Sequence, residues 1–313
     1  MRFAIVGSGA VGGYFGAKLA RNGEDVAFIA RGAHLDAIRR NGLSIRSSQL
    51  GDFVVRAPAE SDSNNVGPVD VVLFTVKAYD NPDALRLLSP LMATESVVLT
   101  LQNGVDSIDE VAAAVGRSRV LGGTTYVATA LEAPGVIVQT GTHRSIIFGE
   151  VFEGRGQISP RVRALADVLT PADIEVTPVP DGLVPIWDKF VYLAPFSGFT
   201  GASRKPIGGI WQDAQARETF YQAAREIAAL AQAEGVALSP DRFQTLEYYM
   251  NSIPPSVRSS LLIDLEAGKR IEVEALQGAA IRRAAKHGLS MPIIATLYAV
   301  LKPWANGPPK SVG

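Results

Sequence analysis

The first thirty-one residues constrain the fold of this chain more than any other segment. An apolar run over Arg2–Val6 predicts a buried strand, and a glycine-rich stretch follows it directly. Helical spacing over residues 11–21 and a second apolar run over Asp25–Ile29 complete a strand–turn–helix–strand unit. A GxGxxG pattern in this context is typical of a dinucleotide-binding βαβ fold. The residues of the turn are Gly7, Ser8, Gly9, Ala10, Val11 and Gly12.

Each glycine of this turn has an expected task. Gly7 allows the tight turn, Gly9 lets the backbone approach a pyrophosphate, and Gly12 lets the helix pack closely on the strand. The N–H groups and the positive dipole end of the following helix then hold the phosphates. We therefore predict that all six residues of the turn bind the cofactor. The alternative, a glycine-rich turn without a ligand, is disfavoured by the strands on both sides.

Arg31 indicates which dinucleotide the site prefers. NAD-preferring sites place an Asp or Glu at the end of the second strand, about 20 residues past the glycines, where it accepts from the ribose 2′-OH. Here Arg31 follows that strand, whereas the acidic Glu24 and Asp25 lie at its other end. A guanidinium can pair with a 2′-phosphate in bidentate fashion. We therefore expect NADP(H); the alternative is an ordinary exposed arginine after a strand.

The composition limits the class of protein. With 313 residues the chain exceeds what one hydrophobic core usually serves, so two domains are expected. A formal net charge of −1 gives no basic footprint for nucleic acid, and no uncharged apolar run is long enough to span a membrane. A strand that begins by residue 3 leaves no room for a signal peptide. We expect a cytoplasmic protein, which also fits the absence of cysteine.

Thiol and metal chemistry are not expected. The chain has no cysteine, which excludes disulfides, thiolate catalysis and Cys-ligated metals. Its three histidines, His34, His143 and His287, form no recognisable arrangement with carboxylates. We therefore predict no metal site and no histidine acid.

The pattern along the chain predicts an α/β fold: an N-terminal Rossmann-type doubly wound sheet followed by a C-terminal all-helical domain. Later strands follow one another without helices, so the far edge of the sheet is expected to be antiparallel. The pattern breaks around residues 177–182, which predicts an NADP-binding domain over 1–178 and a helical substrate and dimerisation domain over 179–313. Further strands are expected at 69–76, 96–100, 119–121, 136–139 and 145–148, and helices at 33–41, 82–91 and 108–115.

The second half carries helix signals. Apolar residues at helical spacing predict a helix over 214–234, with Gly235 as its stop. Ser239-Pro240 and Ser290-Met291-Pro292 each predict a helix start with a cap and a first-turn proline. Residues 307–313 are expected to fray.

Lys189 is the candidate proton donor. Reduction of a carbonyl leaves an oxyanion that needs a proton, and a lysine ammonium is protonated at neutral pH. Its neighbours Trp187 and Phe190 make a mostly apolar setting for a charge. The alternative is a surface lysine paired with Asp188.

Asn103 and Lys77 each follow a predicted strand, at the carboxyl edge where such sheets bind ligands. Asn103 precedes Gly104, so plain turn chemistry is its alternative role. Lys77 could face cofactor or substrate anions, or only solvent.

Together these features resemble the ketopantoate reductase (2-dehydropantoate 2-reductase) family over nearly the whole chain. The resemblance implies that Lys189 donates the proton and that Ser260 and Glu272 contact substrate and cofactor at the reacting centre. It also implies that Lys77 and Asn103 line the nicotinamide side. The family includes dimers, so a homodimer is expected on the resemblance alone. The matching motifs are the glycine turn, Arg31, Lys77-Ala78, Gln102-Asn103-Gly104, Gly123-Thr124-Thr125, Trp187-Asp188-Lys189 and residues 259–272.

One departure concerns the substrate. Family members usually carry asparagines four and eight residues after the lysine, on the same helix face, where this chain has Leu193 and Ser197. Pro195 lies between them and is expected to kink the helix and free the carbonyl of Val191. Loss of an amide that binds a substrate hydroxyl can change discrimination by orders of magnitude. A bulkier or less hydroxylated 2-oxo acid would suit Leu193 better.

The resemblance therefore implies NADPH-dependent reduction of 2-dehydropantoate to pantoate, a step of pantothenate biosynthesis. Hydride transfer to the C2 carbonyl would use Lys189 as proton donor, with Glu272 orienting lysine, substrate or ribose, and Asn103, Lys189, Ser197 and Ser260 binding the substrate. Two alternatives stay open: a reductase of a different small 2-oxo acid, and a non-catalytic NADPH-binding sensor.

Overall fold

The computed structural model describes residues 1–309 and divides into two compact units. Unit 1 comprises Met1–Gln102 and Ser107–Pro185, and unit 2 comprises Asn103–Asp106 and the chain from Ile186 onward. The division falls later than the expected boundary after residue 178, because Glu175–Val179 is a strand of the sheet and the Gly182 N–H donates to the Glu150 carbonyl over 2.8 Å. Fraying was expected over residues 307–313, of which residues 310–313 lie outside the described residues.

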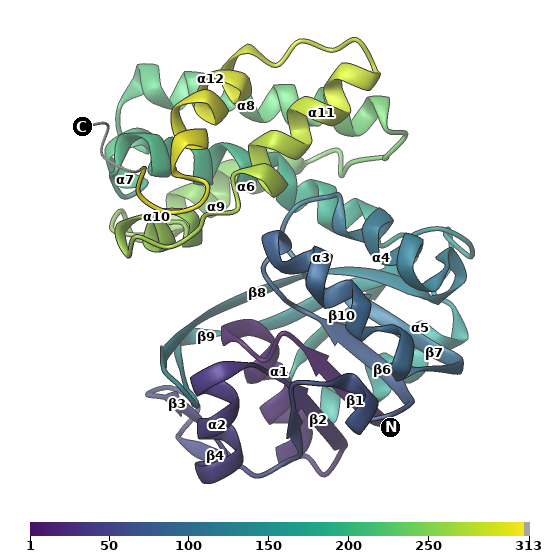
Figure 1. Ribbon diagram of the computed structural model, residues 1–313. Helices are drawn as coiled ribbons and strands as arrows, with labels where there is room; N and C mark the ends of the chain where they lie inside the picture. The colour runs from purple at the N-terminus through teal and green to yellow at the C-terminus, as the bar shows by residue number, and fades with distance from the viewer. Residues whose placement is uncertain (310–313) are drawn as a thin grey trace. The chain divides into compact units, whose positions relative to one another are not determined.

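Within the described residues, unit 1 is built on one ten-stranded, mostly parallel sheet (Figure 1). Its strands are β1 Arg2–Val6, β2 Asp25–Ile29, β3 Leu43–Ser47, β4 Phe53–Val55, β5 Ala59–Glu60, β6 Val69–Phe74, β7 Met92–Thr100, β8 Val120–Ala133, β9 Val136–Glu150 and β10 Glu175–Val179. The spatial order is β4-β3-β9-β8-β7-β6-β1-β2-β5, and β10 pairs with β9. The parallel strand β1 therefore lies between β2 and β6, so the segments that follow these three strands meet at one edge.

The far side of the sheet contains the predicted antiparallel pairing, but it is mixed, because β9 pairs parallel with β3 and β10. β8 and β9 form a long antiparallel pair, and β3 pairs antiparallel with β4. The two short strands expected at 136–139 and 145–148 are one strand, β9. The register of β9 against β8 shifts between the Val127 and Thr129 pairs, and this irregularity takes up the polar residues that interrupt the apolar pattern.

The helices of unit 1 follow the predicted order. The helix expected at 82–91 is instead a short α3 followed by 3-10 turns at Leu85–Leu87 and Ser89–Leu91, because Pro90 cannot donate a helical hydrogen bond. The first helix contacts β1 and β2, and its Tyr14, Phe15 and Leu19 are buried in the core. The helices are α1 Ala10–Arg21, α2 Gly32–Asn41, α3 Asn81–Ala84, α4 Ser107–Val115 and α5 Pro160–Leu169, with 3-10 turns at Ser63–Asn65, Ala78–Asp80, Arg117–Arg119 and Thr170–Ala172.

Helices are the only regular secondary structure in the described residues of unit 2, and the predicted fold class is confirmed. The helix expected at 214–234 is α8, whose Phe220, Ala224 and Ile227 are fully buried. Pro195 lies inside α6, which runs unbroken across it. The helices are α6 Leu183–Ser203, α7 Gly208–Trp211, α8 Ala214–Ala233, α9 Arg242–Ser252, α10 Ser260–Glu266, α11 Ala279–Lys286 and α12 Pro292–Leu301, with a π-helical turn at Glu274–Gly278 and a 3-10 turn at Lys302–Trp304.

The two predicted proline-marked helix starts had different outcomes. α12 begins at Pro292, as expected, but its N-cap is Met291 and not Ser290, and the Glu226 carboxylate accepts from the Ile293 and Ile294 N–H groups. The start predicted at Ser239-Pro240 was wrong, because α9 begins only at Arg242. Ser239 instead bonds to the side chain of Asp188, which accepts from the Ser239 N–H over 3.2 Å and from its hydroxyl.

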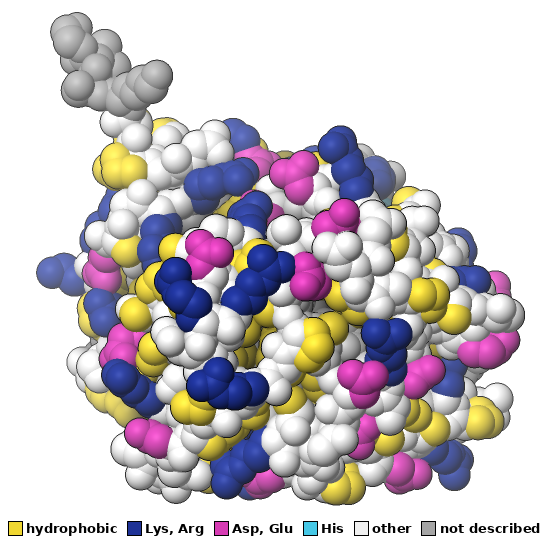
Figure 2. All heavy atoms as spheres, turned by 60° about the horizontal axis from the view of Figure 1, so that its bottom comes forward, with side chains coloured by type: hydrophobic (Ala, Val, Ile, Leu, Met, Phe, Trp, Pro, Cys, Tyr) yellow, Lys and Arg dark blue, Asp and Glu magenta, His cyan; other side chains and the backbone are white. Residues whose placement is uncertain are grey.

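The surface shown in Figure 2 carries basic and acidic side chains interspersed, in keeping with the formal net charge of −1. Among the described residues, no helix combines the length and apolar character that crossing a membrane requires.

Candidate active site

The glycine turn lies at the carboxyl end of β1 and is packed tightly on its sheet side. Gly7 has φ +98°, and a Cβ there would lie 2.5 Å from the Val76 nitrogen. A Cβ on Gly12 would lie 2.1 Å from the Thr75 Oγ1, so the close approach of α1 requires glycine. At Gly9, by contrast, a Cβ would meet nothing within 4 Å. The turn is therefore closed toward the sheet and open at Gly9.

This open side fits a dinucleotide pyrophosphate. Gly9 is the N-cap of α1 and offers no side chain to cap the helix. The first intrahelical bond on that cap runs from the Gly13 N–H to the Gly9 carbonyl over 2.8 Å. The N–H groups of Ala10, Val11 and Gly12 thus belong to the first turn, which has no intrahelical acceptors and attracts anions.

Ser8 anchors the glycine turn to the end of β2. Its buried hydroxyl donates to the Ile29 carbonyl over 2.9 Å, so a contact of Ser8 with the predicted cofactor would use its backbone and not its hydroxyl. His34 was missed by the sequence analysis. Its Nδ1 accepts from the Gly135 N–H over 2.9 Å, which leaves Nε2 to donate to the Ser8 carbonyl over 2.7 Å. No local pattern could reveal a contact that joins residues 26 and 101 positions apart.

Arg31 lies where the sequence predicted it, but it has a partner that the sequence did not reveal. It is the N-cap of α2, directly after β2, and its side chain is 75% exposed. Its guanidinium forms an ion pair with Asp80 over 2.8 Å. Asp80 closes the 3-10 turn after β6, and the half-buried Lys77 is the N-cap of that turn. The edge at Arg31 therefore contains a carboxylate.

In unit 2, Lys189 projects from α6 and donates to Asn103 Oδ1 over 3.2 Å. Lys189 as a whole is half-buried, but protein atoms crowd its ammonium. Burial lowers the pKa of Lys189 from its ordinary 10.5 to about 8, and the nearby carboxylate of Glu272 opposes that shift. Glu272 is itself buried. The structure thus brings Lys189, Asn103 and Glu272 together, while Asp188 is engaged with Ser239.

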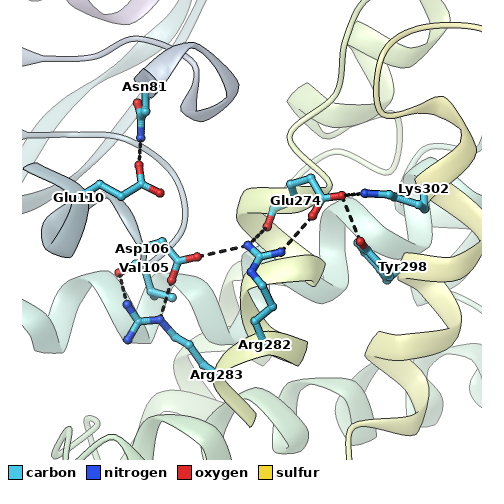
Figure 3. Close-up of polar contacts among 9 residues, drawn as sticks. All are labelled: Asn81, Val105, Asp106, Glu110, Glu274, Arg282, Arg283, Tyr298 and Lys302. Carbon is cyan, nitrogen blue, oxygen red and sulfur yellow. Dashed lines mark hydrogen bonds and ion pairs between the residues drawn. The ribbon is translucent and has the colours of Figure 1, made fainter. Parts of the chain in front are cut away.

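The loop that carries Asn103 is fixed within unit 2. Gly104 has φ +91°, and a Cβ there would lie 2.5 Å from the Ala275 carbonyl oxygen. The Asp106 carboxylate accepts from Arg283 Nε over 2.6 Å, and Arg283 Nη2 donates to the Val105 carbonyl over 3.2 Å (Figure 3). Arg283 therefore holds both the backbone and a side chain of the loop.

A second network in unit 1 holds the chain immediately before Asn103. The Gln102 Nε2 donates to the Val76 carbonyl over 2.7 Å and to Asn81 Oδ1 over 2.6 Å. The buried Asn81 donates in turn to Glu110 (Figure 3). Gln102 thus anchors the backbone immediately before Asn103, a contact that no local sequence pattern predicts.

Ser197 and Ser260, the other two predicted substrate ligands, both lie in unit 2. Ser197 is buried; its hydroxyl donates to the Leu193 carbonyl over 2.6 Å and accepts from Gln277 Nε2 over 3.1 Å. These bonds speak against substrate binding by that hydroxyl. Ser260 is exposed at the first position of α10. Its neighbour Ser259 caps that helix, accepting from the Leu262 N–H over 3.0 Å.

Comparisons with known proteins identify the family of this chain. Residues 3–152 match the family described as "Ketopantoate reductase PanE/ApbA", and residues 184–305 match its C-terminal counterpart. The chain belongs to the ketopantoate reductase family. The resemblance inferred from the motifs is thereby confirmed, and the family is one of oxidoreductases.

Three similar proteins illustrate the relationship. The uncharacterized oxidoreductase YkpB of Bacillus subtilis is 31% identical, covering 96% of this chain and 98% of its own. A 2-dehydropantoate 2-reductase of Nostoc sp. is 29% identical, with 96% and 94% covered. The crystal structure of 2-dehydropantoate 2-reductase from Geobacter metallireducens is 30% identical, has a TM-score of 0.89, and covers 96% of this chain and 99% of its own.

Proposed function

We propose that this chain is an NADPH-dependent reductase that converts 2-dehydropantoate into pantoate, with Lys189 as proton donor. The observation that carries the proposal is the bond from Lys189 to Asn103 together with the lowered pKa of the lysine. A bound nicotinamide dinucleotide supplies the hydride for such a reduction. The chain's own residues would bind the cofactor, orient the groups and deliver the proton.

Lys189 has the properties of a proton donor near neutral pH. With a pKa of about 8, its ammonium is protonated roughly ten to one at pH 7, yet gives up its proton more readily than an ordinary lysine. The carboxylate of Glu272 opposes the effect of burial and helps to keep the ammonium charged. Glu272 would thus tune the donor, and the released proton would go to the carbonyl oxygen at C2.

Asn103 would orient that donor. An ammonium can only donate hydrogen bonds, so the Asn103 atom that faces Lys189 must be the oxygen. The amide nitrogen of Asn103 is then a donor that could serve a substrate or cofactor oxygen. Fixing one ammonium hydrogen on Asn103 limits the rotation of the donor, which favours transfer in one direction.

The choice of NADPH rests on Arg31 and the glycine turn. The open side at Gly9 fits the pyrophosphate, and the exposed guanidinium of Arg31 could bind a 2′-phosphate. Lys77 follows the neighbouring strand β6 and would add positive charge at the same edge.

A second candidate is a reductase of a different small 2-oxo acid. Leu193 lies one turn beyond Lys189 on α6 and presents an aliphatic side chain on the same face. The Ser197 hydroxyl is engaged by Leu193 and Gln277. A substrate with an apolar side chain and no hydroxyl would suit these residues.

A substrate panel tests both candidates. NADPH oxidation would be followed with 2-dehydropantoate and with 2-oxo acids that carry aliphatic or aromatic side chains. A kcat/KM for 2-dehydropantoate at least as high as for the others supports the first candidate. Preference for an apolar acid by more than about tenfold supports the second. Cofactor binding without turnover of any acid would contradict both and favour a sensor.

A further inference from the structure

The ion pair between Arg31 and Asp80 crosses the carboxyl end of β1. Arg31 follows β2 and Asp80 closes the turn after β6, and the sheet places β1 between these two strands. The Arg31 Nη2 and Asp80 Oδ2 atoms lie 2.8 Å apart. Because the glycine turn begins where β1 ends, the pair spans the edge at which this turn starts. Carboxyl edges of this kind are where open parallel sheets bind dinucleotides.

Stability does not account for the pair. The Arg31 side chain is 75% exposed, and ion pairs of such exposed side chains contribute little to folding. Arg31 also lies at the start of α2, where the helix dipole disfavours a cation, and the first turn of α2 contains no acidic residue. An anion beside Arg31 is therefore favoured, and Asp80 supplies it in the absence of another.

We propose that Asp80 is a specificity residue that tempers the preference for 2′-phosphorylated over 2′-hydroxylated dinucleotides. A 2′-phosphate must replace the Asp80 carboxylate on Arg31 and lies beside its negative charge. A ribose 2′-hydroxyl can instead donate to that carboxylate, as it does to the acidic residue at the end of the second strand in NAD-preferring sites. The chain would thus use both cofactors, with a modest preference for NADPH. This inference rests on the proposed binding of a nicotinamide dinucleotide in unit 1.

Equilibrium binding separates this effect from catalysis. Dissociation constants of NADPH and NADH would be measured by protein fluorescence, without substrate, for wild type, Asp80→Asn and Asp80→Glu. Asp83→Asn is the matched control, since Asp83 is exposed in the following helix α3. Thermal melting of each variant reports folding.

The proposal predicts opposite changes for the two cofactors. Asp80→Asn should tighten NADPH binding by about five- to tenfold and weaken NADH binding several-fold, because it removes a repulsive charge and a strong acceptor. Asp80→Glu and Asp83→Asn should keep the wild-type ratio within about twofold. Equal changes for both cofactors, an unchanged ratio in Asp80→Asn, or no binding of either cofactor to the wild type would overturn it. Cofactor binding with these shifts but no turnover of any 2-oxo acid would uphold the role of Asp80 and contradict the proposed reaction.

Discussion

Lys189 and Asn103 are 86 residues apart in the sequence, yet the ammonium of Lys189 donates to the side-chain oxygen of Asn103 over 3.2 Å. Asn103 follows the parallel strand β7, and Lys189 lies in the first turns of α6. The contact therefore joins a loop of the α/β part of the sequence to the helical part. Both residues belong to unit 2, because the loop over Asn103–Asp106 packs with the helices.

The pKa of Lys189 leads to a prediction for the pH dependence of reduction. The donor must be protonated, and its pKa is lowered to about 8. We expect kcat/KM for the 2-oxo acid to fall about tenfold per pH unit above this value. Glu272→Gln removes a charge that raises the pKa, so the falling limb should move about one pH unit lower.

Asn103→Asp should shift the pH at which kcat/KM falls in the direction opposite to that of Glu272→Gln. Aspartate has nearly the same shape as asparagine but adds a carboxylate at the atom that accepts from Lys189. The added negative charge should raise the pKa of Lys189, so kcat/KM should fall only at higher pH. Steady-state profiles from pH 6 to 10 would measure both shifts. Movement of both variants in the same direction would contradict the assignment of the limb to Lys189.

The same shift predicts that Lys189 lowers stability at neutral pH. Its pKa is about 8 in the folded chain against an ordinary 10.5, so the unfolded state binds this proton more tightly. Stability contributed by this group is therefore lowest below pH 8 and is regained as pH rises from about 8 to 10.5. Lys189→Met should raise the free energy of unfolding at pH 7 by about 1–3 kcal/mol. Denaturant melts at pH 7 and pH 10 would show it, and a variant less stable than wild type at pH 7 would refute it.

The glycine turn separates a binding defect from a folding defect. Gly9→Ala meets nothing within 4 Å, so the melting temperature should be unchanged while NADPH binding weakens by about tenfold or more, since the added methyl occupies the phosphate side. Gly12→Ala should lose about 1–3 kcal/mol of stability, because its Cβ would clash with Thr75 and with the Gly7 carbonyl. Unaltered NADPH affinity in a folded Gly9→Ala protein would argue against the proposed phosphate site.

Arg283 should influence turnover without touching the reacting groups. Its side chain is 13% exposed and holds Asp106 and the Val105 carbonyl, so Arg283→Gln should loosen the loop that carries Asn103. We expect kcat to fall about tenfold with little change in NADPH affinity, because the loop belongs to unit 2. Arg282→Gln is the control: its side chain is 52% exposed and also contacts Asp106. Equal losses of kcat in the two variants would contradict the positioning role.

Local signals predicted the parts of the structure that depend on neighbouring residues. The first strand, the glycine turn and the second strand were placed because their spacing is fixed by one βαβ unit. The single helix predicted over 82–91 was wrong, because Pro90 has no N–H to donate and lies in a separate 3-10 turn at Ser89–Leu91. The Ser239-Pro240 pair predicted a helix cap. The bond of the Ser239 hydroxyl to Asp188, 51 residues away, could not be anticipated from neighbouring residues.

The candidate site could be predicted only in part, because many of its contacts join residues far apart in the sequence. Lys189 and Asn103 were both identified, but their contact and the shielding of the ammonium come from tertiary packing. Arg31 was placed correctly, whereas Asp80 was not anticipated, since only the order β2-β1-β6 brings the two together. Ser197 is a substrate ligand only on the family resemblance, and its bond to Gln277, 80 residues further along the chain, could not be anticipated from local spacing.

The most direct test of the account is the kcat/KM for NADPH-dependent 2-oxo acid reduction by Lys189→Ala, with the exposed Lys205→Ala as control. The best substrate of the panel would be used at pH 7, and NADPH binding would be measured on the same samples. We expect a loss of about 10²–10⁴-fold for Lys189→Ala with NADPH affinity retained, and wild-type activity for the control. A Lys189→Ala protein that keeps its activity within about tenfold of wild type would contradict the assignment of Lys189 as proton donor.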